Sequence, residues 1–310
     1  MAIAGQANLN AANTTYETAF QQVFAAGPPG TWQTLTEKKN AQSQFFELDI
    51  INAFPRVRQW VGARQFKDFR AYKQIIELLT WEVSHAESRK KVVYDKSGAV
   101  GEALANFVRQ SAYIYDDIIW QTLLANPTGY DAVSLLNDTH PNVASGATAD
   151  NLTTSALTFE VYRAAVQAME LTADEDGRPL GVFPTHLYVG PAQRRIAEDI
   201  VGPMRVVAVD NAGVETGTRV AAAAVQNAYA GQVQPVVVPW ITGNQWFLAD
   251  NGKAGAKAMI LFEARGPEAI VITDMNMPQR FINDEFWWGI ECDASPAAGL
   301  WQLIYGSVTS

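Results

Sequence analysis

The longest regular spacing of hydrophobic positions lies at residues 98–125. Its apolar residues recur every three or four positions: Val100, Leu104, Phe107, Val108, Tyr115, Ile118, Ile119 and Leu123. This period places them on one stripe of an α-helix. Gly98 stands at the start of the pattern, and Pro127 ends it because proline cannot continue a helix. The spacing predicts a single helix of about 27 residues, roughly 40 Å long.

The chain before this helix shows two different patterns. Residues 1–30 are rich in Ala, Asn, Gln and Thr and end on the breaker run "AAGPPG", which is typical of an arm without a core of its own. Residues 50–97 mix basic and aromatic residues, and Trp81, Val83 and His85 alternate with polar positions. Because alternation with a period of two favours strands, we expect a long extended excursion here.

The chain after this helix begins with a polar loop at 137–154 and then alternates helix and strand signals. A helix over 157–170, the strand "THLYVG" and a helix over 191–201 are expected, with Pro191 at the first helical position. Further strands are expected at 234–241, 244–250, 256–264 and 268–275, the first two paired across a turn at 242–243. The pattern from 155 onward is that of an α/β lobe.

The C-terminal segment is expected to form a closing pair of strands, about 280–293 and 299–307, that turns at "DASPAAG". Trp287 and Trp288 are adjacent, so on a strand their side chains face opposite sides. Both faces of that strand must therefore be covered. The core of the protein covers one face, and a neighbouring subunit is the candidate for the other.

Composition limits the possible functions. The chain has 310 residues, 48% of them hydrophobic and 18% charged, with a formal net charge of -9. These values describe a folded globular protein, and the negative charge argues against a general nucleic-acid binder. The single cysteine, Cys292, forms no internal disulfide and is compatible with a reducing compartment. No secretory signal and no apolar stretch long enough to span a membrane are seen in the sequence.

No metal site is predicted. The histidines His85, His140 and His186 form no close pair and have no cysteines at zinc spacing. His140 with Asp138 nearby could be half of a metal site, but a loop-closing turn is the favoured interpretation. The acidic run at 174–177 lacks the bidentate glutamate of a calcium loop, since Thr185 occupies the twelfth position.

No catalytic or cofactor-binding residue is predicted either. Ala254 follows Gly-Lys where a phosphate loop needs Ser or Thr, and the "GAVG" at 98–101 is only a fragment of a dinucleotide turn. Cys292 has acidic neighbours, which raise the pKa of a thiol rather than lower it. The chain is therefore not expected to be an enzyme.

The order of these segments resembles the major capsid proteins of tailed bacteriophages, and more narrowly the Mu-type major head subunit. The similar segments are 54–69 ("FPRVRQWVGARQFKDF"), 176–200, 238–250 ("VPWITGNQWFLAD") and 286–307 ("FWWGIECDASPAAGLWQLIYGS"). The resemblance implies the α+β fold known as the Hong Kong 97-type capsid fold. In that fold residues 1–49 are the N-terminal arm, 50–97 the extended loop, 98–150 the spine helix and peripheral domain, 151–265 the α/β axial domain, and 266–310 the return strands of the peripheral domain.

The resemblance also implies a function. The chain is expected to assemble, through hexamers and pentamers, into an icosahedral shell that encloses double-stranded DNA without sequence-specific binding. The short arm suggests a separate scaffolding protein, and a portal and decoration proteins are further expected partners. The place of the protein would be the virion, assembled in the cytoplasm of a bacterial host. The alternative is an encapsulin-like compartment around a cargo enzyme. The "CDASPAAG" segment departs from the glycine-rich turn that this family often has.

Charge suggests how neighbouring subunits dock. Residues 50–91 carry nine basic and four acidic side chains, whereas residues 268–310 carry six acidic side chains and one basic. We therefore expect the extended loop, through Arg64, Lys67 and Arg70, to dock onto the acidic C-terminal region of a neighbour. The acidic partners expected there are Asp284 and Glu285, beside Trp287 and Trp288.

Overall fold

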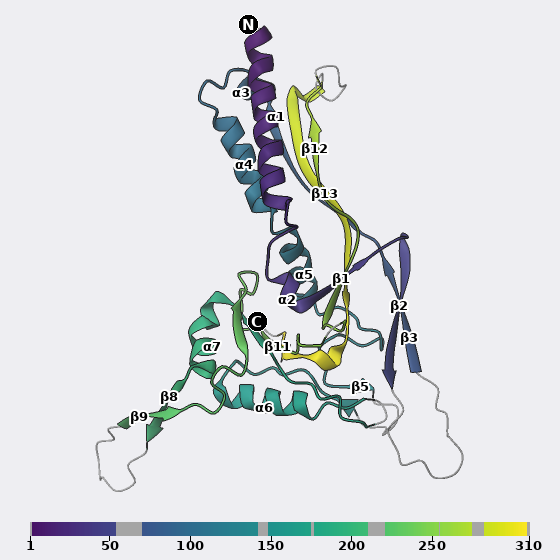
Figure 1. The fold of residues 1–310 in the computed structure, drawn as a ribbon, viewed down its shortest axis with the longest axis vertical. Helices are drawn as coiled ribbons and strands as arrows, with labels where there is room; N and C mark the ends of the chain where they lie inside the picture. The colour runs from purple at the N-terminus through teal and green to yellow at the C-terminus, as the bar shows by residue number, and fades with distance from the viewer. Residues whose placement is uncertain are drawn as a thin grey trace.

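The structure is a computed structural model that describes residues 2–53, 70–141, 148–174, 177–209, 221–253, 255–274 and 282–308. It is elongated (Figure 1): helices α1 and α4 lie beside the long strands β12 and β13 in one half. The other half contains helices α6 and α7 around a smaller sheet. The two halves are joined by α5 and by the strands that run between them.

The larger sheet has four strands in the order β1-β12-β13-β4. Their bounds are Thr36–Asn40 for β1, Met259–Ile272 for β12, Glu285–Ala298 for β13 and Thr80–Ser88 for β4. β13 lies in the middle and pairs antiparallel with both β12 and β4. The period-two pattern at 81–85 is confirmed, because exposed and half-buried residues alternate along β4.

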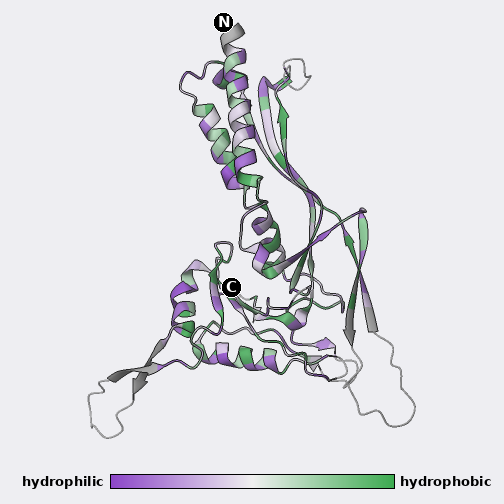
Figure 2. Cartoon of the chain, viewed as in Figure 1, coloured by the Kyte–Doolittle hydropathy of each residue, from purple (hydrophilic) through white to green (hydrophobic). Residues whose placement is uncertain are grey.

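Two helices cover one face of this sheet. The helix α1 (Ala2–Phe24) packs with α4 (Ala99–Ser111) against the sheet through one buried cluster. Leu9 and Tyr16 of α1 are buried there, and the Tyr16 hydroxyl donates a hydrogen bond to the carbonyl of Gly289. Residues 2–24 are thus helical, and they bury their apolar face against other parts of the chain rather than in a core of their own. The buried residues of α1 recur every three or four positions and so share one face, namely Leu9, Ala12, Tyr16 and Ala19. Colours alternate along both helices in Figure 2.

The predicted helix over 98–125 is two helices, α4 and α5 (Ile114–Leu124), separated by residues 112–113. The start is confirmed: Gly98 has the left-handed φ of 76°, and Asp95 accepts the backbone N–H of Val100. The end is also confirmed, because α5 ends at Leu124, just before Asn126 and Pro127. The break has a physical cause, because the apolar residues of α4 belong to the cluster under α1, whereas those of α5 belong to the main core.

The smaller sheet has the order β10-β7-β11-β14. Its strands are β10 (Gln234–Val237), β7 (His186–Val189), β11 (Trp246–Ala249) and β14 (Ile304–Ser307). The predicted α/β pattern is confirmed by α6 (Phe159–Glu170), β7, the short η1 (Pro191–Gln193) and α7 (Arg194–Val201). The predicted pairing of β10 with β11 is wrong. β7, whose residues Leu187, Tyr188 and Val189 are buried, lies between them and pairs with both.

The predicted C-terminal pair is also wrong. The "DASPAAG" segment is not a turn but the second half of β13, and β14 belongs to the other sheet. Small residues suit this half of the strand, since Ala294 and Ala298 are buried in the main core. Likewise the two strands expected at 256–264 and 268–275 are one strand, β12, whose register shifts between Glu263 and Glu268.

The extended excursion is confirmed as an antiparallel hairpin of β2 (Phe45–Ala53) and β3 (Arg70–Glu77), which begins before residue 50. β4, by contrast, belongs to the large sheet and is followed by α3 (Arg89–Val93). The remaining described elements are α2 (Trp32–Leu35), β5 (His140–Pro141), β6 (Thr148–Ala149), β8 (Met204–Val209), β9 (Ala221–Gln226) and η2 (Trp301–Leu303).

The packing of α1 predicts the effect of shortening one of its side chains. Leu9→Ala is expected to lower the free energy of unfolding by about 2–5 kcal/mol, because it leaves a cavity under a side chain that is 2% exposed. The matched control Gln6→Ala, on the exposed face of α1, should change it by no more than ~0.5 kcal/mol. Urea denaturation measures both. Equal effects from the two variants would mean that α1 does not pack on the sheet.

Candidate assembly surfaces

The face of the large sheet opposite the helices is made of alternate residues of three strands. Trp287 on β13 lies directly between Ala86 on β4 and Ile272 on β12. Trp288 points the other way, is 1% exposed, and donates a hydrogen bond to Asn13 of α1. Trp287 is half-buried although α1 and α4 lie on the opposite face. The two tryptophans therefore occupy opposite faces of one strand, and the face of Trp287 has room for another molecule.

A groove of about 470 Å³ runs along this outer face. Ile270, Ile272 and Trp287 form apolar parts of its lining, and Gly289 lies among them. Gly289 has no side chain that would take up space in the groove. The site is also tight, because a Cβ there would lie 3.3 Å from the hydroxyl of Ser84. The surface is apolar and concave, as expected of a docking site for a side chain.

One end of the groove is acidic. Glu82, Glu291 and Glu268 occupy directly opposed positions on β4, β13 and β12. Like charges in such cross-strand positions are destabilising. Arg265 relieves part of this repulsion, since it forms ion pairs with Glu291 at 2.5 Å, with Asp293 at 3.0 Å and with Glu268 at 3.3 Å.

Glu82 is at the edge of this row and accepts a hydrogen bond from the hydroxyl of Ser84. In the part of the chain that the structure describes, it forms no ion pair. The three opposed glutamates and Asp293 carry four negative charges, and Arg265 supplies one positive charge. We call the glutamates Glu82, Glu268 and Glu291 the acidic row. A cation from outside the subunit would neutralise part of the remaining negative charge.

Of the residues predicted to dock, Arg64 and Lys67 lie outside the described residues, and Arg70 is the first residue of β3. Asp284 has a partner in its own chain, because its carboxylate forms an ion pair with Arg89 at 2.7 Å. Glu285 accepts a hydrogen bond from the indole of Trp287. Charge counting locates an acidic region, and the strand register shows that the acidic row is the less neutralised part of it.

The hairpin offers a second surface. Its inner face packs Leu48 and Ile76 into the main core. On its outer face, Phe45 is 54% and Ile75 70% exposed. Large apolar side chains that are this exposed indicate a contact surface when they gather on one element. The sequence pattern does not single out these residues, because hydrophobic residues occur on both faces of β2 and β3 and interrupt the alternation.

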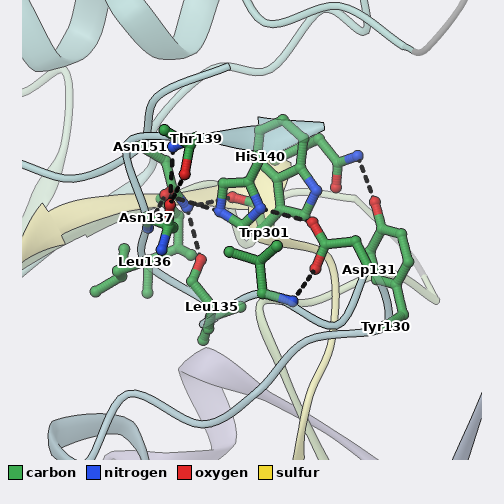
Figure 3. A network of polar contacts seen from close by, with 12 residues as sticks. Tyr130, Asp131, Leu135, Leu136, Asn137, Thr139, His140, Asn151 and Trp301 are labelled. Atoms are coloured by element: carbon green, nitrogen blue, oxygen red, sulfur yellow. Dashed lines mark hydrogen bonds and ion pairs between the residues drawn. The ribbon is translucent and has the colours of Figure 1, made fainter. Parts of the chain in front are cut away.

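A buried polar network lies where the 126–151 segment meets the C-terminal strands (Figure 3). His140 is fully buried, and its Nδ1 lies 2.7 Å from a carboxylate oxygen of Asp131. Its Nε2 lies 3.1 Å from Oδ1 of Asn151, and its ring stacks on Trp301 at 4.2 Å. The acidic partner is Asp131 and not Asp138, which the sequence had suggested. The described residues include no group of three His, Cys, Asp or Glu arranged to hold a metal ion.

The single cysteine lies in the main core of the described residues. Cys292 is buried, and burial raises the pKa of its thiol to about 12, with the carboxylates of Glu263 and Asp293 acting in the same direction. The acidic surroundings predicted from the sequence are thus present, but burial is the larger cause. Burial also lowers the pKa of His186. None of the helices in the described ranges is long and apolar enough to cross a membrane.

The chain is similar to known proteins in sequence and in fold. The sequence model of a family described as phage capsid protein matches residues 71–305. No curated protein sequence matches the chain. Among solved structures, a chain of the procapsid of bacteriophage JBD30 is similar with a TM-score of 0.56 and 17% identity, over 98% of this chain and 76% of that one.

Two further solved structures are similar in fold. A chain from Microbacterium phage Oxtober96 gives a TM-score of 0.54 at 10% identity, over 90% of this chain and 86% of that one. A chain of the SrpI encapsulin complex of Synechococcus elongatus gives 0.50 at 9% identity, over 91% and 90%. At these identities the structural likeness concerns the fold alone.

Because the acidic row places like charges opposite one another, removing one of them should stabilise the subunit. Glu82→Gln should raise the free energy of unfolding of the isolated subunit by about 0.2–1 kcal/mol, because it removes a like charge opposite Glu291. The gain should shrink in high salt, which screens exposed charges. Glu17→Gln on the exposed face of α1 is the control and should show no gain. Chemical denaturation at low and high salt measures both variants, and a loss of stability in Glu82→Gln would contradict the repulsion.

Proposed function

Because the chain belongs to the phage capsid protein family and has the Hong Kong 97-type fold, it is a major capsid shell protein, and we propose that it is the head subunit of a Mu-type tailed phage. The observation that carries this proposal is the family match over 71–305, which includes β4, the spine helices and β13. Copies of the chain would close, through hexamers and pentamers, into an icosahedral shell within the virion.

The outer sheet face would be the docking site for a second copy. The 54–70 segment carries Arg56, Arg58, Arg64, Lys67 and Arg70 against the single acidic residue Asp68, with Trp60, Phe66 and Phe69 among them. An apolar groove with an acidic end fits a segment of this composition. Each exposed ion pair contributes only ~0–1 kcal/mol, but a contact repeated at every subunit fixes the register of the whole shell.

The remaining partners follow from the same role. The shell would enclose double-stranded DNA loosely, since a net charge of -9 does not favour a tight grip on phosphates. A separate scaffolding protein, a portal and decoration proteins would complete the particle, assembled in the host cytoplasm. The role would be structural and not catalytic. An encapsulin-type compartment is the second candidate, favoured by the similarity to the SrpI encapsulin chain.

Shell formation is the first test. The purified protein, co-expressed with the genes that neighbour its own, should form closed particles or ring-shaped capsomers in electron micrographs. Particles that contain DNA would support the phage head, and particles filled with one host or cargo enzyme would support the encapsulin alternative. A protein that remains a ~34 kDa monomer in light scattering at high concentration would contradict both.

The docking site predicts a pair of charge reversals. Changing Arg64, Lys67 and Arg70 together to Glu should leave the subunit folded but block or strongly weaken assembly, because the acidic row would then repel the neighbour's loop. Adding Glu82→Lys and Glu291→Lys should partly restore particles. The control adds Asp284→Lys and Glu285→Lys instead, which should restore less because Asp284 is paired with Arg89, whereas Arg265 is shared among three carboxylates of the acidic region. Particle yield by sedimentation measures the series, and normal assembly of the triple variant would rule out this docking.

A further inference from the structure

The buried network around His140 connects the projecting hairpin to the C-terminal strands. On the hairpin side, Tyr72 of β3 packs on Tyr130 with ring centroids 5.2 Å apart. The side-chain amide of Gln74 donates a hydrogen bond to the carbonyl of Thr128. The turn at 128–134 therefore lies directly against the strand β3. Its tip holds Asp131, the partner of His140.

On the other side, the network is fixed to η2 and β14. The Nδ2 of Asn151 donates to the carbonyls of Leu135, Trp301 and Ile304 at 2.8 to 3.2 Å. The Oδ1 of Asn151 accepts the backbone N–H of Asn137 at 2.8 Å. These four bonds leave one orientation for the amide, so the atom that faces His140 is an acceptor.

Both ring nitrogens of His140 therefore lie against fixed partners. Nε2 lies 3.1 Å from Oδ1 of Asn151, and Nδ1 lies 2.7 Å from the carboxylate of Asp131, whose side chain is only 4% exposed. The other carboxylate oxygen accepts the N–H of Val133. Figure 3 shows the imidazole held between these two acceptors and over Trp301. Every direction in which the ring could turn breaks one of these bonds.

Such a network does more than fill space. A buried hydrogen-bonded pair adds little net stability compared with apolar residues of the same size, but it specifies one arrangement of the groups around it. Here the described stretches 126–141 and 148–151 contain only the two-residue strands β5 and β6, and the side-chain bonds supply the rigidity that backbone ladders supply elsewhere. The hairpin also packs Leu48 and Ile76 into the main core, and the network fixes the turn against which Tyr72 and Gln74 of β3 lie.

We propose that His140 and Asp131 are positioning residues that hold the β2–β3 hairpin at one angle to the body of the subunit. The angle matters because, on the proposed shell function, this hairpin carries the loop that reaches the neighbour. A hairpin held less rigidly would allow a wider range of angles between neighbouring subunits. Identical contacts made at variable angles close into shells of variable size. The pair would thus set the uniformity of the shell rather than the strength of the contacts.

Hydrogen exchange of the unassembled subunit tests the positioning directly. His140→Ala should speed amide exchange in the strands of the hairpin, 45–53 and 70–77, by roughly tenfold, while β7 and β11 keep their protection. His140→Asn, which can still donate to Asp131, should fall between wild type and His140→Ala. The matched control is Asn227→Ala, which removes another buried polar side chain, bonded to the carbonyls of Ile200 and Gly202 at the end of α7. Figure 1 shows α7 on the opposite side of the molecule from β2 and β3. This control should leave the hairpin at the wild-type rate.

Tyr130→Phe provides a milder variant in case His140→Ala does not fold. It removes the hydroxyl that accepts the hydrogen bond of Gln302 and keeps the ring against Tyr72. It should speed exchange in the hairpin by a few fold and nowhere else. Unchanged hairpin exchange in this variant, or faster exchange in all strands alike in His140→Ala, would overturn the proposal.

Particle size gives the second readout. Shells of His140→Asn should show a broader diameter distribution in electron micrographs than shells of Asn227→Ala. Equal distributions alongside a loosened hairpin would overturn the link to shell uniformity. If the wild-type protein forms no shells, the proposed function fails, and hydrogen exchange still decides whether the pair positions the hairpin.

Discussion

The structure depends on the burial of one face of β13. Phe286, Trp288 and Ile290 point toward α1 and α4, and further along Cys292 and Ala294 enter the core under α5. Each large apolar side chain buried in this way contributes about 1.5–3 kcal/mol. Since neighbouring residues of a strand face opposite sides, this burial places the intervening residues of all three strands on the outer face. The groove and the acidic row are thus a geometric consequence of the core.

The parts of the fold that could be predicted from the sequence depend on one local pattern and one core. Helix α6, strand β7 and Pro191 at the start of η1 are such cases. The hydrophobic spacing along α6 matches the single cluster into which its buried residues pack. The spine helices show where local reading fails. The stripe over 98–125 is continuous in sequence, but its two halves belong to different clusters, and no spacing reveals that the cores diverge.

The pairing of the strands could not be predicted from the sequence, for a different reason. "DASPAAG" contains the residues of a turn, yet it continues as a strand because Ala294 and Ala298 allow α5 and the core to approach closely. The docking residues show the same limit. Charge counting located an acidic region, but the pairing of Asp284 with Arg89 and the alignment of Glu82 opposite Glu291 follow from register, which connects positions about 200 residues apart.

The polar features of the subunit differ in what they do for a shell. The acidic row opposes like charges and so weakens the isolated subunit, an effect that a basic segment of a neighbour would offset only in the assembled state. The His140 network is complete within one chain, with each ring nitrogen bonded. An acidic row with excess negative charge would favour association with a basic segment, and the buried His140 network would fix the angle at which subunits associate. A subunit that must close a shell of defined size needs both, because attraction without a fixed angle gives aggregates and a fixed angle without attraction gives monomers.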